Sequence, residues 1–173
     1  MQAAHAFPLP DDTPPEDLFT TAGMDDLESI LQLEYLAYPN PWSRRQFTEI
    51  LRSQGTSCGH YLVQLLWSKT PPGGTLRGYY VAMLGYEEVH LLNLAVHPDC
   101  QKQGRGLVLL QHLRNWAQWY GARTLWLEVR ASNPRAQRIY REFGFEQVAM
   151  RKDYYPLPQG GREDALVMQL PLA

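Results

Sequence analysis

The sequence has few cysteines and no metal-ligand pattern. Its only two cysteines, Cys58 and Cys100, stand far apart and form no C-x-x-C pair. This spacing argues against a structural disulfide or a zinc site, and it favours a reducing compartment. The five histidines also lack the spacing of metal ligands. We therefore expect no metal, and we interpret both cysteines as structural residues.

The sequence also lacks any apolar run long enough to span a membrane. Its first residues, MQAAHAFPLPDD, have neither the charged start and apolar stretch of a secretory signal nor the arginines of a transit peptide. A formal net charge of −2 argues against a general nucleic-acid binder. We expect a cytoplasmic protein that contacts neither membrane nor nucleic acid directly.

What is present suffices for one folded domain. The chain has 173 residues, of which 45% are hydrophobic, enough to bury a core. Residues 1–16 are rich in Pro, Asp and Ala, which predicts a flexible tail before a domain over 17–173.

Hydrophobic periodicity and cap residues predict an α/β fold. Helices are expected from Met24, over 43–53 behind a Ser43/Gln46 capping box, over 106–120, and over 133–143. Strands are expected over 17–21, 60–67, 76–84, 88–96, 125–129, 146–151 and 165–170. One helical crossover joins the fourth strand to the fifth, so these two strands should be parallel.

The stretch QKQGRG, residues 101–106, lies between a predicted strand and a predicted helix. Its glycines allow a tight turn and leave backbone N–H groups uncovered at a helix N-terminus, where an anion such as a pyrophosphate is favoured. A plain strand-to-helix turn is the alternative. The Rossmann pattern is absent because Leu109 stands where its third glycine would fall, and the lysine-serine pair of a P-loop is absent too.

Further motifs lie on both sides of this loop in the sequence. LAVHP precedes it at residues 94–98, and LEVRASN (127–133), YREFGF (140–145), RKDYYP (151–156) and GREDA (161–165) follow. Together they resemble the Gcn5-related N-acetyltransferase (GNAT) superfamily, in particular its bacterial ribosomal-protein-alanine acetyltransferases of the RimI type. The resemblance covers residues 91–170 well and 18–86 more weakly. It implies a single GNAT domain with a mixed, mostly antiparallel, twisted sheet of about seven strands, a parallel central pair and about four helices.

The resemblance also implies an activity and its site. The chain would transfer acetyl from acetyl-CoA to the N-terminal alanine amine of a small-subunit ribosomal protein (protein eighteen), as a monomer or weak dimer. Glu128 would be the general base and Tyr140 the general acid. The cofactor would bind Leu94, Ala95, Val96, Lys102, Gln103, Gly104, Arg105, Gly106, Leu107 and Asn133. Relatives often carry a basic residue where this chain has Leu107, so Lys102 or Arg105 would supply the charge.

The two catalytic candidates each have an alternative role. Glu128 shares one face of its strand with Trp126, where it is either a base or a solvated ion-pair partner. Tyr140 either donates a proton, for which a phenol pKa near 10 is suitable, or packs against the core. A modest base suffices for an N-terminal amine, whose pKa is near 7.7–8.0, whereas lysine has a pKa near 10.4.

The acceptor side is less defined by the sequence. Tyr154 and Tyr155, expected in the loop before the last strand, and Trp42 between the first two helices would line a peptide groove. Alternatively, these three are ordinary edge aromatics. Residues 162–164 are expected to fix that loop by ion pairing, and His90, a second candidate base, is interpreted as a core or surface histidine. A broader lysine or small-amine acetyltransferase and a non-catalytic acyl-CoA-binding module remain alternative functions.

Overall fold

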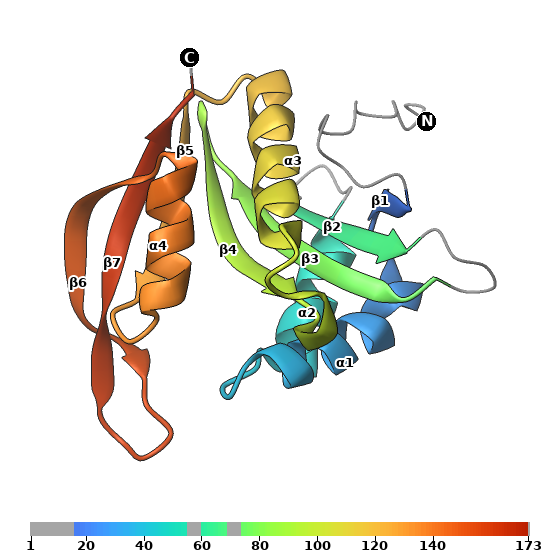
Figure 1. Cartoon of the computed structure of the whole chain (residues 1–173), viewed down its shortest axis with the longest axis horizontal. Coiled ribbons are helices and arrows are strands. Elements are labelled where there is room, and N and C mark those ends of the chain that lie inside the picture. The colour runs from blue at the N-terminus through green and yellow to red at the C-terminus, as the bar shows by residue number, and fades with distance from the viewer. Residues whose placement is uncertain (1–15, 55–59, 69–73, 173) are drawn as a thin grey trace.

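The computed structural model describes residues 16–54, 60–68 and 74–172. Cys58 and all of the predicted tail except Glu16 lie outside these ranges. Seven strands form one sheet in the order β1-β2-β3-β4-β5-β7-β6 (Figure 1). The strands are β1 (Asp17–Thr21), β2 (Tyr61–Ser68), β3 (Leu76–Leu84), β4 (Glu88–Val96), β5 (Thr124–Arg130), β6 (Glu146–Pro156) and β7 (Arg162–Pro171).

Helices cover both faces of this sheet. The helices α1 (Leu27–Ala37) and α2 (Arg44–Ser53) share one hydrophobic core with β2 and β3. The helices α3 (Arg105–Tyr120) and α4 (Pro134–Phe143) border a second core on the opposite face (Figure 1). Two short 3₁₀ turns, Met24–Asp26 and Pro98–Cys100, complete the described elements. The predicted mixed α/β architecture is confirmed.

Local sequence signals account for the helix ends. Ser43 caps α2, with its Oγ accepting from the Gln46 backbone N–H at 3.3 Å, as the capping box predicted. Asn133 caps α4 through its Oδ1, which accepts from the Ala136 N–H at 3.0 Å. Gly121 and Gly144 end α3 and α4 in the left-handed conformation, at φ 90° and 112°.

The parallel pair β4–β5 is short, and the two strands then separate. Their pairing covers only Glu88–Leu91 against Thr124–Leu127. A register shift in the β3–β4 ladder leaves Leu92 as an extra residue just beyond this point. Figure 1 shows β4 curving away from the half of the sheet formed by β5, β7 and β6. The sheet is therefore split at the carboxyl ends of β4 and β5, where the motifs LAVHP and LEVRASN lie.

The last two strands are longer than the sequence predicted. Strand β6 continues to Pro156 and β7 begins at Arg162, so Tyr154 and Tyr155 lie in a strand and not in a loop. The register breaks between Arg151 and Tyr155, and Asp153 has φ 48°. This bulge interrupts the alternation of side chains, so the charged residues Lys152 and Asp153 ended the predicted strand too early.

Candidate active site

A cleft of about 720 Å³ lies where β4 and β5 separate. Its walls come from the α1–α2 connection, the second half of β4, the start of α3, β5 and α4. Most of the predicted site residues line it: Trp42, Leu94, Ala95, Val96, Lys102, Gly104, Arg105, Gly106, Leu107, Glu128, Asn133, Tyr140 and Tyr155. Gln103 and Tyr154 are not among the lining residues. Within the described ranges, no group of three or more His, Cys, Asp or Glu side chains could hold a metal ion.

One wall of the cleft is an unpaired edge of β4. In the described part of the chain, β4 has no pairing with β5 beyond Leu91. A strand edge of this kind can accept an extended chain that carries amide groups. The Leu94 carbonyl oxygen currently accepts a hydrogen bond from the Tyr38 hydroxyl, and the Val96 carbonyl accepts from Gln101 Nε2 at 3.2 Å. The edge therefore suits the two amides of a pantetheine arm.

The start of α3 closes one end of this wall. Gly104 is its N-cap, at φ 81°, and Lys102 before it is also left-handed, at φ 60°. The first backbone N–H groups of a helix lack intrahelical partners and favour an anion. Leu107 lines the cleft at 47% exposure and brings no charge. The arrangement fits the pyrophosphate of coenzyme A, with Lys102 as the nearby positive side chain.

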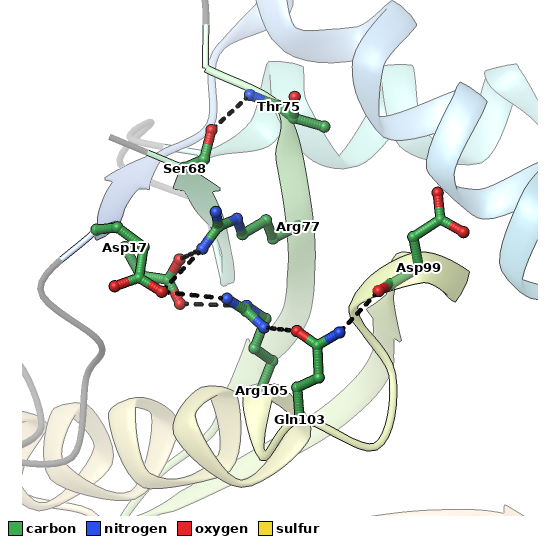
Figure 2. A network of polar contacts seen from close by, with 8 residues as sticks. Asp17, Ser68, Thr75, Arg77, Asp99, Gln103 and Arg105 are labelled. Carbon is green, nitrogen blue, oxygen red and sulfur yellow. Dashed lines mark hydrogen bonds and ion pairs between the residues drawn. The ribbon is translucent and has the colours of Figure 1, made fainter. Parts of the chain in front are cut away.

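Arg105 differs from its predicted role at the level of the side chain. Its guanidinium is buried and points to Asp17, with Nε 3.3 Å from Oδ2 (Figure 2). It is therefore engaged away from any phosphate in the cleft. Arg135, which sequence reasoning missed, lines the cleft and donates to Gln101 Oε1 at 3.0 Å.

Glu128 lies on β5 with its side chain 25% exposed. Its Oε2 accepts from the Tyr154 hydroxyl at 3.0 Å, and its Oε1 is 3.0 Å from Nε of Arg151. Both partners come from β6, and the bulge there positions Tyr154 beside the carboxylate. The carboxylate thus lines the cleft and is an ion-pair partner, and its role as a base stays a prediction.

Tyr140 reaches the cleft from α4, and its ring packs edge-on against Phe145, 5.8 Å between centroids. Burial raises the pKa of its phenol to about 12. The hydroxyl is therefore protonated at neutral pH, and burial makes it a weaker acid than a free phenol. Tyr140 both packs against the core and faces the cleft.

Two aromatic side chains line the cleft from different parts of the chain, Tyr155 from β6 and Trp42 from the connection between α1 and α2. Tyr155 donates to the Glu128 backbone oxygen at 3.2 Å, and Arg130 lies over its ring at 4.4 Å. Burial is the main cause that raises the pKa of Tyr155 above its usual range. Trp42 approaches from the other side, between α1 and α2. Tyr154 contacts Glu128 instead of lining the cleft.

A buried polar cluster holds Trp42 in place. The Trp42 backbone N–H donates to Glu34 Oε1 at 2.7 Å, and the Tyr79 hydroxyl donates to Glu34 Oε2. Asn93 Nδ2 donates to both oxygens at 3.3 Å. Burial raises the pKa of Glu34. Sequence reasoning missed this cluster, although a glutamate among Ile30, Leu31 and Leu33 on one helix was a signal.

Other predicted residues take structural roles. His90 does not line the cleft; it lies 2.9 Å from Glu88 and stacks on Trp126, which agrees with a surface histidine. Glu163 pairs with Arg130 at 2.7 Å. Arg162 donates to the Asp153 carbonyl at 2.5 Å and so holds the β6 bulge. This segment fixes local structure as expected, but it does so within a strand and largely by hydrogen bonds to the backbone.

Comparisons with known proteins point to one family. The sequence of residues 27–145 matches the protein-family model described as "Acetyltransferase (GNAT) family". The [ribosomal protein bS18]-alanine N-acetyltransferase of Escherichia coli K12 is 36% identical over 148 residues, which is 86% of this chain and 93% of that protein. The enzyme of the same name from Haemophilus ducreyi is 37% identical over 145 residues, 84% of this chain and 93% of that protein.

Solved structures also resemble this chain. The crystal structure of the ribosomal-protein-S18-alanine N-acetyltransferase from Escherichia coli superposes with a TM-score of 0.78 at 36% identity, over 91% of this chain and 94% of that one. Arabidopsis thaliana NAA60 in complex with acetyl-CoA superposes with a TM-score of 0.77 over 90% of this chain and 98% of that one. At 20% identity, this second likeness concerns the fold alone.

Proposed function

The chain belongs to the GNAT acetyltransferase family, and from that membership we propose that it transfers the acetyl group of acetyl-CoA to the N-terminal alanine of a small-subunit ribosomal protein. The observation that carries the chemistry is the split between β4 and β5, where Glu128 and Tyr140 line the same cleft. The choice of acceptor is supported by the 36% identity to a bS18-alanine acetyltransferase over most of both chains.

Acetyl-CoA supplies an acetyl group activated as a thioester. The β4 edge at Leu94–Val96 hydrogen-bonds the pantetheine amides, and the residues 102–107 bind the pyrophosphate with backbone N–H groups and the Lys102 ammonium. For the Leu94 carbonyl to take part, the Tyr38 hydroxyl must exchange its bond to it. Asn133, which lines the cleft and caps α4, would contact the cofactor near its thiol.

Glu128 accepts the proton of the attacking amine, and Tyr140 returns a proton to the departing sulfur. The amine nitrogen bonds to the acetyl carbon while the carbon–sulfur bond breaks. The proton on Glu128 then passes to the Tyr140 phenolate through solvent, which restores both groups for the next turnover. A free N-terminal amine has a pKa near 7.7–8.0, which leaves little work for the base at neutral pH. Tyr154 and Arg151 hold the Glu128 carboxylate in one orientation. Tyr155 and Trp42 enclose the peptide end.

Mass spectrometry tests this proposal directly. The protein is incubated with acetyl-CoA and three acceptors: a peptide that begins with Ala, the same peptide with a blocked N-terminus and a free lysine, and a polyamine. We expect one added acetyl group on the free Ala peptide alone. Glu128→Gln is the matched control, because the amide keeps the shape of the carboxylate but accepts a proton poorly.

Each other outcome has a defined meaning. Acetylation of the lysine peptide or the polyamine would keep the chemistry and refute the acceptor. Binding of acetyl-CoA without turnover of any acceptor would indicate an acyl-CoA-binding module instead of an enzyme.

A further inference from the structure

A buried ion pair connects the first strand to the start of α3. The Asp17 side chain is fully buried, and Arg105 is 7% exposed. Arg105 Nε lies 3.3 Å from Asp17 Oδ2, and Arg77 of β3 donates to Asp17 Oδ1 (Figure 2). Glu16 adds a weaker contact, with Oε1 3.4 Å from both arginines.

The same network continues into the loop before α3. Arg105 donates from its other side to the Gln103 side-chain oxygen, and Gln103 Nε2 donates to the Asp99 carbonyl at 2.9 Å (Figure 2). The side chains of Gln103 and Arg105 thus connect Asp17 to the backbone at residue 99. These positions bracket Gly104, whose φ of 81° sets the direction in which the helix begins.

Stability alone does not explain the burial of these charges. Removing two charges from water is costly, and a buried ion pair often adds no stability over apolar residues of similar size. What it does provide is a defined geometry, because both partners must stay aligned. Arg105 is the first residue of α3, so its backbone lies in the N-terminal turn at the cleft while its side chain extends to Asp17.

We propose, resting on the acetyl-CoA site described above, that Asp17 is a positioning residue for pyrophosphate binding. It touches no ligand itself. Through Arg105 and Gln103 it holds the loop 101–106 so that the N–H groups at the start of α3 face the phosphates. The N-terminal strand, at the far edge of the sheet from β5, thereby contributes to cofactor affinity.

The test compares a ligand that carries the pyrophosphate with one that lacks it. The Kd of CoA is measured by calorimetry and the Kd of pantetheine by ligand-observed NMR titration, with no acceptor present. For Asp17→Asn we expect CoA to bind roughly tenfold more weakly, because the ion pair between residue 17 and Arg105 is lost. Pantetheine should bind as it does to the unchanged protein. The ratio of the two constants is a readout that a loss of stability would not move.

A second variant guards against misfolding. Asp17→Leu combined with Arg77→Met and Arg105→Met removes the buried carboxylate together with both of its guanidinium partners, so that no buried charge is left unpaired, and it should show the same selective loss for CoA. Tyr80→Phe is the matched control, because it removes a buried hydrogen bond to His112 Nδ1, 2.9 Å long, under the same helix. It should leave the ratio unchanged.

Equal losses for both ligands, no loss for either, or a changed ratio in Tyr80→Phe would each overturn the positioning role. Failure of the unchanged protein to bind CoA would instead refute the proposed function.

Discussion

Tyr140 and Glu128 enter the cleft from adjacent elements, and their surroundings differ in kind. Tyr140 is set among apolar neighbours such as Phe145, whereas Glu128 has a charged and a phenolic partner. A neutral donor and a charged acceptor therefore face one space. This difference supports the proposed roles of Tyr140 as the acid and Glu128 as the base.

Tyr140→Phe should lower kcat about 100-fold, within the range for loss of a general acid. The Kd of acetyl-CoA should be nearly unchanged, because the ring and its packing against Phe145 remain. Steady-state kinetics and a binding titration measure the two quantities. Tyr120→Phe, at a tyrosine that is 44% exposed on α3, is the control. If both variants turned over at the same rate, Tyr140 would have no part in proton transfer.

At the level of elements, the approach of α3 to the sheet depends on a missing side chain. A Cβ on Gly78 of β3 would lie 2.8 Å from the Ala95 carbonyl oxygen and 2.9 Å from Leu109 Cδ1. Since Ala95 belongs to β4 and Leu109 to α3, this one glycine sets the spacing of two elements that line the cleft.

Gly78→Ala should therefore lower the free energy of unfolding by about 1–3 kcal/mol, the usual cost of overpacking. It should also weaken acetyl-CoA binding, because β4 and α3 must move. Urea unfolding and a binding titration test both parts. Gly23→Ala, where a Cβ would meet its nearest atom only at 3.9 Å, provides the comparison. A Gly78→Ala protein with unchanged stability would show that the contact is easily relieved.

The bulge in β6 creates contacts that the local sequence pattern did not predict. Arg151 and Tyr154 contact Glu128 only because the ladder slips between Arg151 and Tyr155. The sequence predicted a strand that ends at Arg151 and a loop that contains Tyr154. The pairing partner β7, held by Arg162 and Glu163, keeps the segment in the sheet.

Across the whole molecule, stability should depend on pH through a buried histidine. His112 of α3 interacts with the Tyr80 hydroxyl and stacks on Phe19 at 3.8 Å. Burial lowers its pKa to about 4, against 6.5 when it is exposed. The unfolded chain therefore binds a proton more readily than the folded protein between these values. The contribution of neutral His112 is present above pH 6.5 and is lost as the pH falls toward 4.

The full loss should be about 3 kcal/mol, from 1.36 kcal/mol for each pKa unit, and about 2 kcal/mol of it should fall between pH 7 and pH 4.5. Urea unfolding at pH 7 and pH 4.5 measures it. Glu34, whose pKa burial raises, shifts stability in the opposite sense, because its folded form binds protons more readily. The His112→Asn variant keeps Glu34, so the difference between the two proteins isolates the histidine. Its stability should fall less between the two pH values; equal falls would contradict the assignment.

By itself the sequence determined the family, the order of the elements and most helix ends. Ser43, Asn133, Gly121 and Gly144 act on neighbouring backbone groups, so their effect can be read locally. It also indicated the lining residues of the cleft, because the motif order resembles that of the family.

Only the tertiary structure decided which side chains pair. The contact of Arg105 with Asp17, the enclosure of Glu34 and the two partners of Glu128 all join segments distant in the chain. A side chain's charge and shape allow many partners, and folding selects one by bringing two strands or a strand and a helix together. For that reason Arg105 could be predicted at the phosphate loop, but the direction of its guanidinium could not.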